Sequence, residues 1–266
     1  MTAVEYRGQT TVITGASAGL GAEFARQLAA RGSDLILVAR RADRLDALAT
    51  ELAAAHGIRV TPIPLDLSLP GAGRALAAEV SARALPVTSV INNAGFGTFG
   101  PFHREDPERL QAEVAVDIAA VVDISRAFID QLRQTGNGVL LNVASMAAYL
   151  PVPNMAVYAA SKAFVLNFTE ALWQESLETG LRVMALSPGA TATEFFEVIG
   201  NDAAAGGTRR DTPEQVVTSA LRALDRRNPG PSTIPGRGDR IATALGRMLS
   251  RRRGVLLMAG MTRTDR

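Results

Sequence analysis

The sequence of 266 residues contains no cysteine, only two histidines and no long apolar run. The missing cysteine excludes disulfides, thiolate zinc sites and cysteine nucleophiles. No His or acidic residues cluster at ligand spacing, so no metal is expected, and His56 and His103 are predicted at the surface. No apolar run approaches the ~18 residues of a membrane span, and the N-terminus lacks the pattern of a signal peptide. We therefore expect a cytoplasmic protein without a membrane span.

Lysine is almost missing as well. The 28 Lys and Arg residues include a single lysine, Lys162, so arginine carries nearly all the positive charge. Because 26 acidic residues oppose them, the net charge is only +2, which gives no general nucleic-acid footprint. In a composition that avoids lysine everywhere else, the position of Lys162 needs a local explanation.

Short apolar runs alternate with longer segments whose apolar residues recur at helical spacing. This alternation is typical of βαβ units, in which helices cover both faces of a parallel sheet. It predicts an α/β fold, a single doubly wound, Rossmann-type sheet. The predicted strands are residues 10–14, 35–39, 60–65, 87–91, 139–143 and 182–186, and the predicted helices are residues 20–31, 44–56, 73–84, 107–133 and 158–179.

A glycine-rich turn, TGASAGLG at residues 14–21, joins the first predicted strand to an amphipathic helix. Glycines at such a turn let the backbone approach a pyrophosphate, and the helix N-terminus offers free N–H groups. We predict a dinucleotide site formed by Gly15, Ser17, Gly19, Leu20 and Gly21. The second glycine cluster, residues 95–100, is followed by Pro101 rather than a helix, so it is expected to be a loop near the site.

The end of the second predicted strand bears on the choice of cofactor. In dinucleotide folds an acid there binds the ribose 2′-OH, whereas Arg pairs with a 2′-phosphate. Here the strand ends in Arg40 and Arg41, with Arg44 following and no acid before Asp43. This favours NADP(H) over NAD(H); the alternative is that these are ordinary solvated residues of an Arg-rich chain.

Tyr158 and Lys162 are four residues apart in YAASK, which places both on one face of a helix. A phenol, with a pKa of about 10, is a poor base at neutral pH, but a neighbouring ammonium is expected to lower that pKa. Tyr158 could then act as a general acid or base on a carbonyl oxygen. Ser145 ends the strand LLNVAS, at the edge where ligands bind in open sheets, and could donate to the same oxygen.

With these motifs in place, residues 8–235 resemble the short-chain dehydrogenase/reductase family, in particular its bacterial short-subunit NADP-dependent reductases. The matching segments are residues 14–21, Asp66 in LDL, NNAG at 92–95, Ser145, YAASK at 158–162 and SPGATAT at 187–193. Residues 1–235 would then form the dinucleotide-binding catalytic domain, with a mobile substrate loop near 194–212. The Arg-rich tail, residues 236–266, is assigned to the same domain.

The resemblance implies roles for the matching residues. Tyr158 would exchange the proton, Lys162 would bind the nicotinamide ribose and tune Tyr158, and Ser145 would orient the substrate. It also implies a homodimer or homotetramer built on the helices at 107–133 and 158–179. The cofactor contacts would be Asp66 at the adenine, Asn92, Asn93, Ala94 and Gly95 along the sheet edge, and Pro188, Gly189 and Thr193 at the nicotinamide end.

One position departs from the family pattern. Many members carry an Asn in the helix after NNAG that completes a proton relay, whereas this chain has Asp117 in the aligned segment. The carboxylate of Asp117 could take over the side-chain contacts of that Asn. Its charge could instead lower activity, or shift the pH optimum upward by stabilising protonated Lys162. We predict retained activity and place Asp117 among the catalytic residues.

The expected substrate side of the site is mostly apolar, which favours a hydrophobic or bulky carbonyl compound, although several of its residues could be ordinary core. These residues are Phe96, Phe99, Met146, Tyr149, Leu150, Met155, Phe195 and Phe196. Near the C-terminus, GRMLSRRRGVLLMAGM joins a triple Arg to an apolar run. A membrane-surface or partner contact is one interpretation; a solvated helix end followed by a packed or frayed tail is preferred.

The sequence thus predicts an oxidoreductase that transfers a hydride between NADP(H) and a ketone or secondary alcohol, with a small molecule and no nucleic acid as partner. Two alternatives stay open. One is an NAD-linked alcohol dehydrogenase. The other is a dinucleotide-binding sensor or interaction protein in which Asp117 has weakened catalysis.

Overall fold

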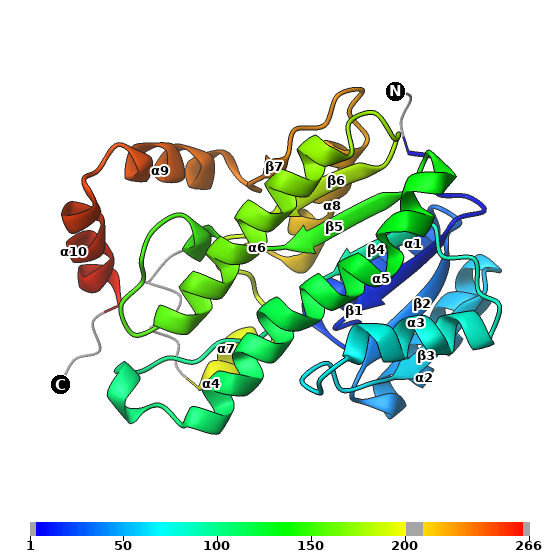
Figure 1. Cartoon of the computed structure of the whole chain (residues 1–266), viewed down its shortest axis with the longest axis horizontal. Coiled ribbons are helices and arrows are strands. Elements are labelled where there is room, and N and C mark those ends of the chain that lie inside the picture. The colour runs from blue at the N-terminus through cyan, green and yellow to red at the C-terminus, as the bar shows by residue number, and fades with distance from the viewer. Residues whose placement is uncertain (1–3, 201–209, 263–266) are drawn as a thin grey trace.

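Seven parallel strands form one sheet in the order β3-β2-β1-β4-β5-β6-β7 (Figure 1), in a computed structural model that describes residues 4–200 and 210–262. The strands are β1 Thr10–Thr14, β2 Asp34–Ala39, β3 Val60–Pro64, β4 Ser89–Asn92, β5 Val139–Val143, β6 Arg182–Leu186 and β7 Ser232–Thr233. The chain order reverses between β1 and β4, and open sheets bind ligands in the crevice at such a point. The predicted doubly wound fold is confirmed.

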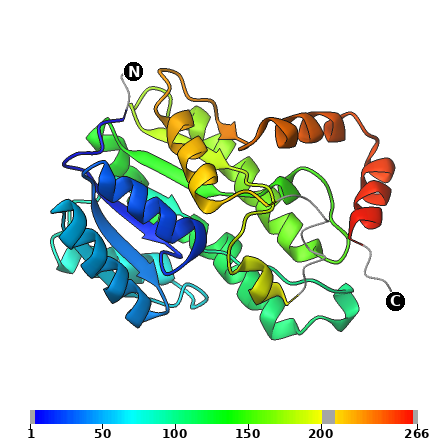
Figure 2. The same cartoon turned by 180° about the vertical axis from the view of Figure 1, so that it is seen from behind.

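Helices cover both faces of the sheet, as Figures 1 and 2 show from opposite sides. Successive strand residues point to opposite faces, so Ile13 packs in the core with Phe24 of α1 while Val12 packs with Leu76 of α3. One layer contains α1 Gly19–Ala30, α2 Ala42–His56 and α8 Pro213–Leu224, and the other contains α3 Ala72–Ala82, α5 Ala120–Thr135 and α6 Ala156–Glu175.

The helix predicted at residues 107–133 is interrupted. α4 spans Pro107–Val114, a π-helical turn spans Ala115–Ala119, and α5 follows. The predicted start is right, because the Asp106 side chain accepts a hydrogen bond from the Glu108 backbone N–H at 3.0 Å and Pro107 follows it. π-Helical turns inside α-helices are frequent at functional sites, and this one contains Asp117.

The C-terminal part of the chain is more ordered than its sequence predicts. A short helix, α7 Phe195–Ile199, lies in the segment expected to be a loop, while residues 201–209 lie outside the described residues. After β7, α9 spans Arg237–Arg247 and α10 spans Arg251–Met261, so the tail predicted to be packed or frayed is helical, and it packs on Leu150 at Gly254. These two helices form one end of the molecule, away from α2 and α3 (Figures 1 and 2).

Candidate active site

The turn between β1 and α1 is tightly fitted around its glycines. Gly15 and Gly19 have φ angles of +66° and +54°, a region that side-chain-bearing residues rarely adopt. A Cβ on Gly15 would lie 2.8 Å from Asn93 Nδ2, and one on Gly21 would overlap the Gly15 carbonyl. Ala18, which precedes α1, makes no side-chain cap. The first N–H groups of the helix are therefore available to a phosphate, as a dinucleotide site requires.

Polar groups after β4 hold this turn in place. Asn93 Nδ2 donates to the Thr14 carbonyl at 2.9 Å, and the Thr14 hydroxyl accepts from the backbone N–H groups of Asn93 and Ala94, both at 3.0 Å. Asn92 points into the sheet, where its Nδ2 donates to Asn142 Oδ1 at 2.9 Å. The NNAG segment thus fixes the glycine turn on one side and joins β4 to β5 on the other.

Ser145, Tyr158 and Lys162 meet at the carboxyl end of the sheet. Ser145 follows β5, and Tyr158 and Lys162 lie one turn apart on the buried face of α6. Lys162 Nζ lies 5.6 Å from the centre of the Tyr158 ring, and the Ser145 hydroxyl is near enough to lower the pKa of Tyr158. Ser145 Oγ also accepts from the Ala147 N–H at 3.1 Å, so the serine hydroxyl hydrogen remains to be donated elsewhere.

A buried ion pair lies beside Tyr158. Asp117 Oδ2 is 3.1 Å from Lys162 Nζ, and the two side chains are 0% and 5% exposed. Asp117 Oδ1 accepts from the Phe96 N–H at 3.0 Å. Gly95 passes over the pair, since a Cβ there would lie 2.9 Å from Lys162 Nζ and 3.0 Å from Asp117 Oδ1. Asp117 therefore contacts Lys162 directly.

Sequence reasoning overlooked a second buried carboxylate, Glu113, one helical turn before Asp117. The Glu113 side chain is fully buried, and neither of its carboxylate oxygens has a hydrogen-bond partner among the described residues. Burial raises the pKa of Glu113 from 4.5 to about 7; the Thr98 hydroxyl and Lys162 oppose this rise, and Asp117 and Glu105 add to it. The i, i+4 spacing to Asp117 was the available signal. The described residues contain no group of His, Asp and Glu that could hold a metal ion.

These neighbours overturn the expected direction of the Tyr158 pKa. Burial raises the pKa of Tyr158, and this outweighs the lowering by Lys162 and by the hydrogen bond to Ser145. Asp117 and Glu113 raise it further, because negative charge nearby disfavours a phenolate. Burial by itself would lower the pKa of Lys162, but Asp117 and Tyr158 reverse this and raise it, which keeps the amine protonated. The contribution of Lys162 has the predicted sign; the net direction was predicted wrongly.

The Arg residues after β2 hold a partner that the sequence did not suggest. Glu194, just before α7, lies 2.9 Å from Arg41 Nη1 and 2.6 Å from Arg44 Nη1. Arg41 also donates to Ser17 Oγ in the glycine turn, at 3.0 and 3.2 Å. Hydrogen bonds from Arg44 and Arg41 lower the pKa of Glu194, so it is ionised at neutral pH. The two guanidinium groups therefore already hold an anionic group, the carboxylate of Glu194.

Asp66 lies in the turn after β3. Its carboxylate accepts from the Ser68 backbone N–H at 2.9 Å and from the Ser68 hydroxyl at 2.8 Å. The backbone hydrogen bond is the largest effect that lowers the pKa of Asp66, and the charge of Arg40 adds to it. Arg40 thus lowers the pKa of Asp66, the residue that the family resemblance places at the adenine, whereas Arg41 binds Glu194.

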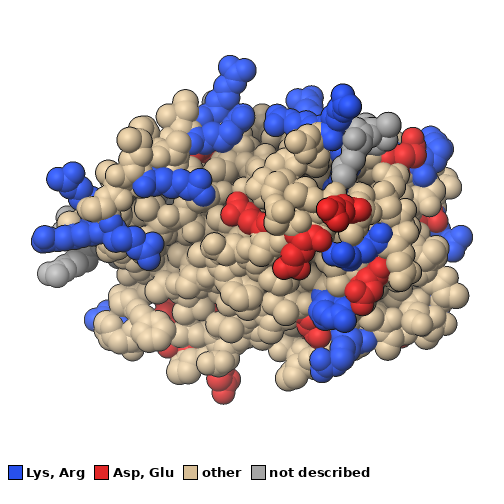
Figure 3. Space-filling model, turned by 45° about the horizontal axis from the view of Figure 1, so that its top comes forward, with Lys and Arg blue, Asp and Glu red and all other residues tan. Residues whose placement is uncertain are grey.

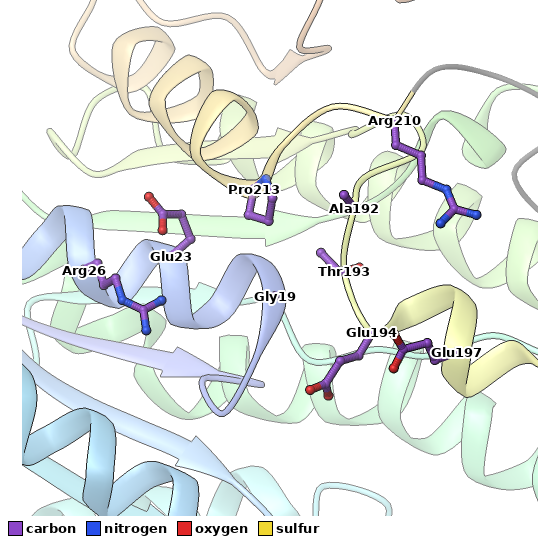
Figure 4. Close-up of a pocket in the computed structure, with 9 residues that line it drawn as sticks. All are labelled: Gly19, Glu23, Arg26, Ala192, Thr193, Glu194, Glu197, Arg210 and Pro213. Carbon is purple, nitrogen blue, oxygen red and sulfur yellow. The ribbon is translucent and has the colours of Figure 1, made fainter.

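A cleft of about 490 Å³ separates α1 from the segment before α7 (Figure 4). Figure 4 shows Glu23 and Arg26 on the α1 side and Thr193 and Glu194 on the other. Thr193 closes over the glycine turn, since a Cβ on Gly19 would lie 3.1 Å from Thr193 Cγ2. The residues that line the cleft are Gly19, Glu23, Arg26, Ala192, Thr193, Glu194, Glu197, Arg210 and Pro213.

The segment after β6 continues from this cleft toward Ser145. The Pro188 carbonyl accepts from the Met146 N–H at 2.9 Å, which ties it to the residue after Ser145. Gly189 has no room for a side chain, because a Cβ there would lie 2.5 Å from Asp239 Oδ2 and 3.3 Å from Met146 Sδ. Leu20, by contrast, packs against the core beneath α1.

Apolar side chains form a wall beside Tyr158. The Phe195 ring centre lies 5.3 Å from that of Tyr158, and Phe99 and Met155 pack in the same cluster. Phe196 is turned away under the Arg210 guanidinium, 4.3 Å from its ring centre. Only part of the predicted substrate side therefore gathers around the reactive hydroxyl.

Tyr149 and Leu150 meet the C-terminal helices instead. A Cβ on Gly246 or on Gly254 would lie 3.2 or 3.0 Å from the Leu150 side chain. The Arg247 guanidinium lies 5.0 Å above the Tyr149 ring. Neither glycine stood out in the sequence, because a close approach between distant segments leaves no local pattern.

Comparison with known proteins places this arrangement in a family. Residues 9–204 match the family model described as short chain dehydrogenase. The chain belongs to the short-chain dehydrogenase/reductase family. It is therefore related to oxidoreductases, and its Rossmann-type sheet is the one that similar solved structures share.

The related proteins differ in their substrates. Sulfoacetaldehyde reductase 2 of Chromohalobacter salexigens is 36% identical over 206 residues, which cover 76% of this chain and 81% of that protein. A short-chain dehydrogenase from Sphingobium yanoikuyae, solved in complex with NADPH, is 33% identical with a TM-score of 0.80 and covers 90% of this chain and 92% of the other. A bulky-bulky ketone specific alcohol dehydrogenase from Comamonas testosteroni is 27% identical with a TM-score of 0.74 and covers 91% and 95%.

Length and cofactor complete the comparison. The chain spans about 62% of the length of the first curated relatives that it matches, at 29% and 31% identity. Several similar structures were solved with NADPH or NADP, which agrees with the NADP(H) cofactor predicted from the sequence.

Proposed function

We propose that the protein reversibly transfers a hydride between NADP(H) and a ketone or secondary alcohol, with Tyr158 as the acid and base. The observation that carries this proposal is the placement of Tyr158 among Ser145, which lowers its pKa, and Lys162, whose Nζ lies 5.6 Å from its ring centre. This group lies at the carboxyl end of the sheet, beside the phosphate-binding turn.

In the reductive direction, the hydride that is added to the carbonyl carbon would come from NADPH when it is bound. The Tyr158 hydroxyl donates its proton to the carbonyl oxygen as the alcohol forms, and the Ser145 hydroxyl donates a hydrogen bond to the same oxygen. The raised pKa of Tyr158 keeps its proton in place until that transfer, which suits the role of acid. In the oxidative direction Tyr158 must first lose this proton, and Lys162 stabilises the phenolate that results.

Arg41 and Arg44 support NADP(H) as the preferred cofactor. Both guanidinium groups bind the carboxylate of Glu194, which shows that an anionic group can be held between them. A 2′-phosphate presents the same kind of acceptor oxygens, and Arg pairs with phosphate in a fork geometry. NADH lacks this group, so it would gain nothing from the two residues.

The wall beside Tyr158 favours an apolar carbonyl compound. Phe99, Met155 and Phe195 pack around the ring edge of Tyr158 and offer no charged group to a substrate. A bulky ketone, of the kind named for the relative from Comamonas testosteroni, would bury apolar surface there. A small sulfonate, of the kind named for the relative from Chromohalobacter salexigens, would find no counter-charge on this wall.

The substitution Tyr158→Phe tests the proposal. It removes the reactive proton and leaves the ring, so turnover of an apolar ketone with NADPH should fall by roughly 10²–10⁴-fold while NADPH binding is retained. Tyr6→Phe is the matched control, because Tyr6 is also buried but lies in the core with α1. Turnover is followed by NADPH absorbance and binding by fluorescence titration. Undiminished turnover in Tyr158→Phe, or a wild-type protein that binds NADPH but reduces no member of a carbonyl panel, would contradict it and favour a sensor.

A further inference from the structure

The C-terminal helices leave most of their apolar side chains uncovered. Among the described residues, 14 large hydrophobic side chains are exposed, and eight of them lie between residues 241 and 261. Ile241 and Leu245 of α9 and Met248 directly after it are 61%, 60% and 83% exposed. Their i, i+4, i+7 spacing places them on one face of the helix. Exposed apolar side chains on one helix face do not stabilise a globular protein, and such a patch is typical of an interaction surface.

This apolar face points away from the rest of the protein. The side of α9 that packs on the body carries Thr243 and Gly246, and Gly246 contacts Leu150. In α10 the packed side carries Gly254 and Met258, while Leu256 and Leu257 are 62% and 51% exposed. Both helices are therefore anchored through small or half-buried residues and present leucine, isoleucine and methionine outward.

Positive charge surrounds these apolar residues. Residues 237–262 include a single acid, Asp239, which lies 2.5 Å from the position of a Cβ on Gly189 and so faces the body. Figure 3 shows basic side chains projecting from the left end of the molecule, over α9 and α10. The arginines of this segment are Arg237, Arg240, Arg247, Arg251, Arg252 and Arg253.

We propose that α9 and α10 dock the protein onto an anionic lipid surface. An amphipathic helix with an apolar stripe and an arginine-rich flank lies in the membrane interface, with the stripe among the acyl chains and the arginines at the headgroups. The described residues contain no helix long and apolar enough to cross a membrane, so the contact is peripheral.

Charge decides between this occupant and a second copy of the chain. A two-fold interface brings the same patch of both subunits together, so a face that includes Arg251, Arg252 and Arg253 would meet its own charge. Nucleic acid would satisfy the arginines but would leave Ile241, Leu245 and Met248 in contact with water. An anionic membrane would contact the arginines through its headgroups and the apolar side chains through its acyl chains.

The location of the two helices fits such a surface. Leu150 and Tyr149, which α9 and α10 contact, follow Ser145 by a few residues, and Met258 packs in the apolar cluster that contains Tyr158. The two helices therefore pack against residues that neighbour the proposed active site.

Vesicle sedimentation of the full chain tests the proposal. Binding is expected to vesicles of phosphatidylcholine mixed with phosphatidylglycerol, and much less to phosphatidylcholine alone. The triple variant Arg251→Gln/Arg252→Gln/Arg253→Gln should lower the partition coefficient on the order of a hundredfold, since each basic residue contributes roughly fivefold. Higher salt should weaken wild-type binding in the same direction.

Apolar variants separate docking from simple charge attraction. Leu245→Asp/Met248→Asp should abolish sedimentation with either vesicle, and circular dichroism should be unchanged because both side chains are exposed. Leu69→Asp is the matched control, since Leu69 is also 60% exposed but lies before α3. Failure of the wild type to bind, or binding that Leu245→Asp/Met248→Asp leaves intact, would overturn the proposal. Loss of a dimer in light scattering, without vesicle binding, would assign the face to a second copy and also overturn it.

Discussion

Two charged clusters of the candidate site differ in their access to water. The first contains Glu113, Asp117 and Lys162, all buried. The second contains Glu194 with its two arginine partners, whose side chains are 39–46% exposed. In the interior, charges interact strongly and set one another's pKa; near the surface, water and salt screen the same interaction. The inner cluster is therefore suited to proton chemistry, and the outer one to ligand selection.

The sharpest test of this difference is to remove Lys162. The substitution Lys162→Met leaves Asp117 buried without its ion-pair partner, and the free energy of unfolding should fall by about 3–5 kcal/mol. The double variant Lys162→Met/Asp117→Asn should recover most of that loss, because the amide can still accept from the Phe96 N–H. Urea denaturation measures both.

The control for this experiment is an exposed ion pair. Arg126 and Asp130 are 2.9 Å apart with both side chains 71% exposed, so Arg126→Met should change stability by at most about 1 kcal/mol. Equal effects of Lys162→Met and Arg126→Met would remove the distinction between the two clusters.

Glu113 predicts a pH dependence of stability. Its pKa is raised by burial from 4.5 to about 7, so the folded protein retains a proton that the unfolded chain loses in this window. Stability should therefore be highest below pH 4.5 with respect to this group, and about 3 kcal/mol of it should be lost as the pH rises to about 7. Glu113→Gln has no titrating carboxyl at this position and avoids the loss. The free energy of unfolding of the variant should therefore increase relative to that of the wild type between pH 5 and pH 8. Glu108→Gln, at an exposed position of the same helix, is the control.

Asp117→Asn tests the effect of the inner cluster on catalysis. The variant removes a negative charge that raises the pKa of Tyr158, so that pKa should fall. The acidic limb of the oxidation pH–rate profile should then move to lower pH by on the order of one unit, because Tyr158 must be deprotonated to act as base. An unchanged profile would rule out the charge effect assigned to Asp117.

The smallest effect is expected at the outer cluster. Glu194 and a 2′-phosphate compete for the same two guanidinium groups, so Glu194→Gln should tighten NADPH binding by about 2–5-fold and leave NADH binding unchanged. Glu197→Gln, which changes another carboxylate lining the same cleft, should leave the ratio of the two affinities unaltered. Tightening of both cofactors alike would show that Glu194 does not act through the phosphate end.

Much of the fold could be predicted from local sequence patterns, because the burial of short apolar segments and the turns between them depend on neighbouring residues in the chain. β1, β5 and β6 begin and end at the predicted residues, since an apolar run bounded by polar residues and turns specifies a buried strand. The π-helical turn was missed because Ala115–Ala119 has an ordinary helical composition. α10 was not predicted, because a packed or frayed tail left its conformation open, and the contact with Leu150 that holds the helix in place joins segments distant in the chain.

The candidate site shows the same division. Spacing placed Tyr158 and Lys162 on one helix face, and they lie there. The direction of the Tyr158 pKa could not be predicted, because it depends on burial and on Glu113 and Asp117, which reach the site from another helix. Glu194 contacts Arg41 from 153 positions away in the chain, and such a pairing has no local signal.

Leu150 couples the positions of the two C-terminal helices. Its side chain fits between Gly246 and Gly254, so a single residue sets the spacing of two helices from the reactive end of the sheet. A larger residue at that position would push both helices outward together, and a smaller one would let them settle inward. A single substitution at Leu150 would therefore reshape the surface beside Tyr149 without altering Ser145, Tyr158 or Lys162.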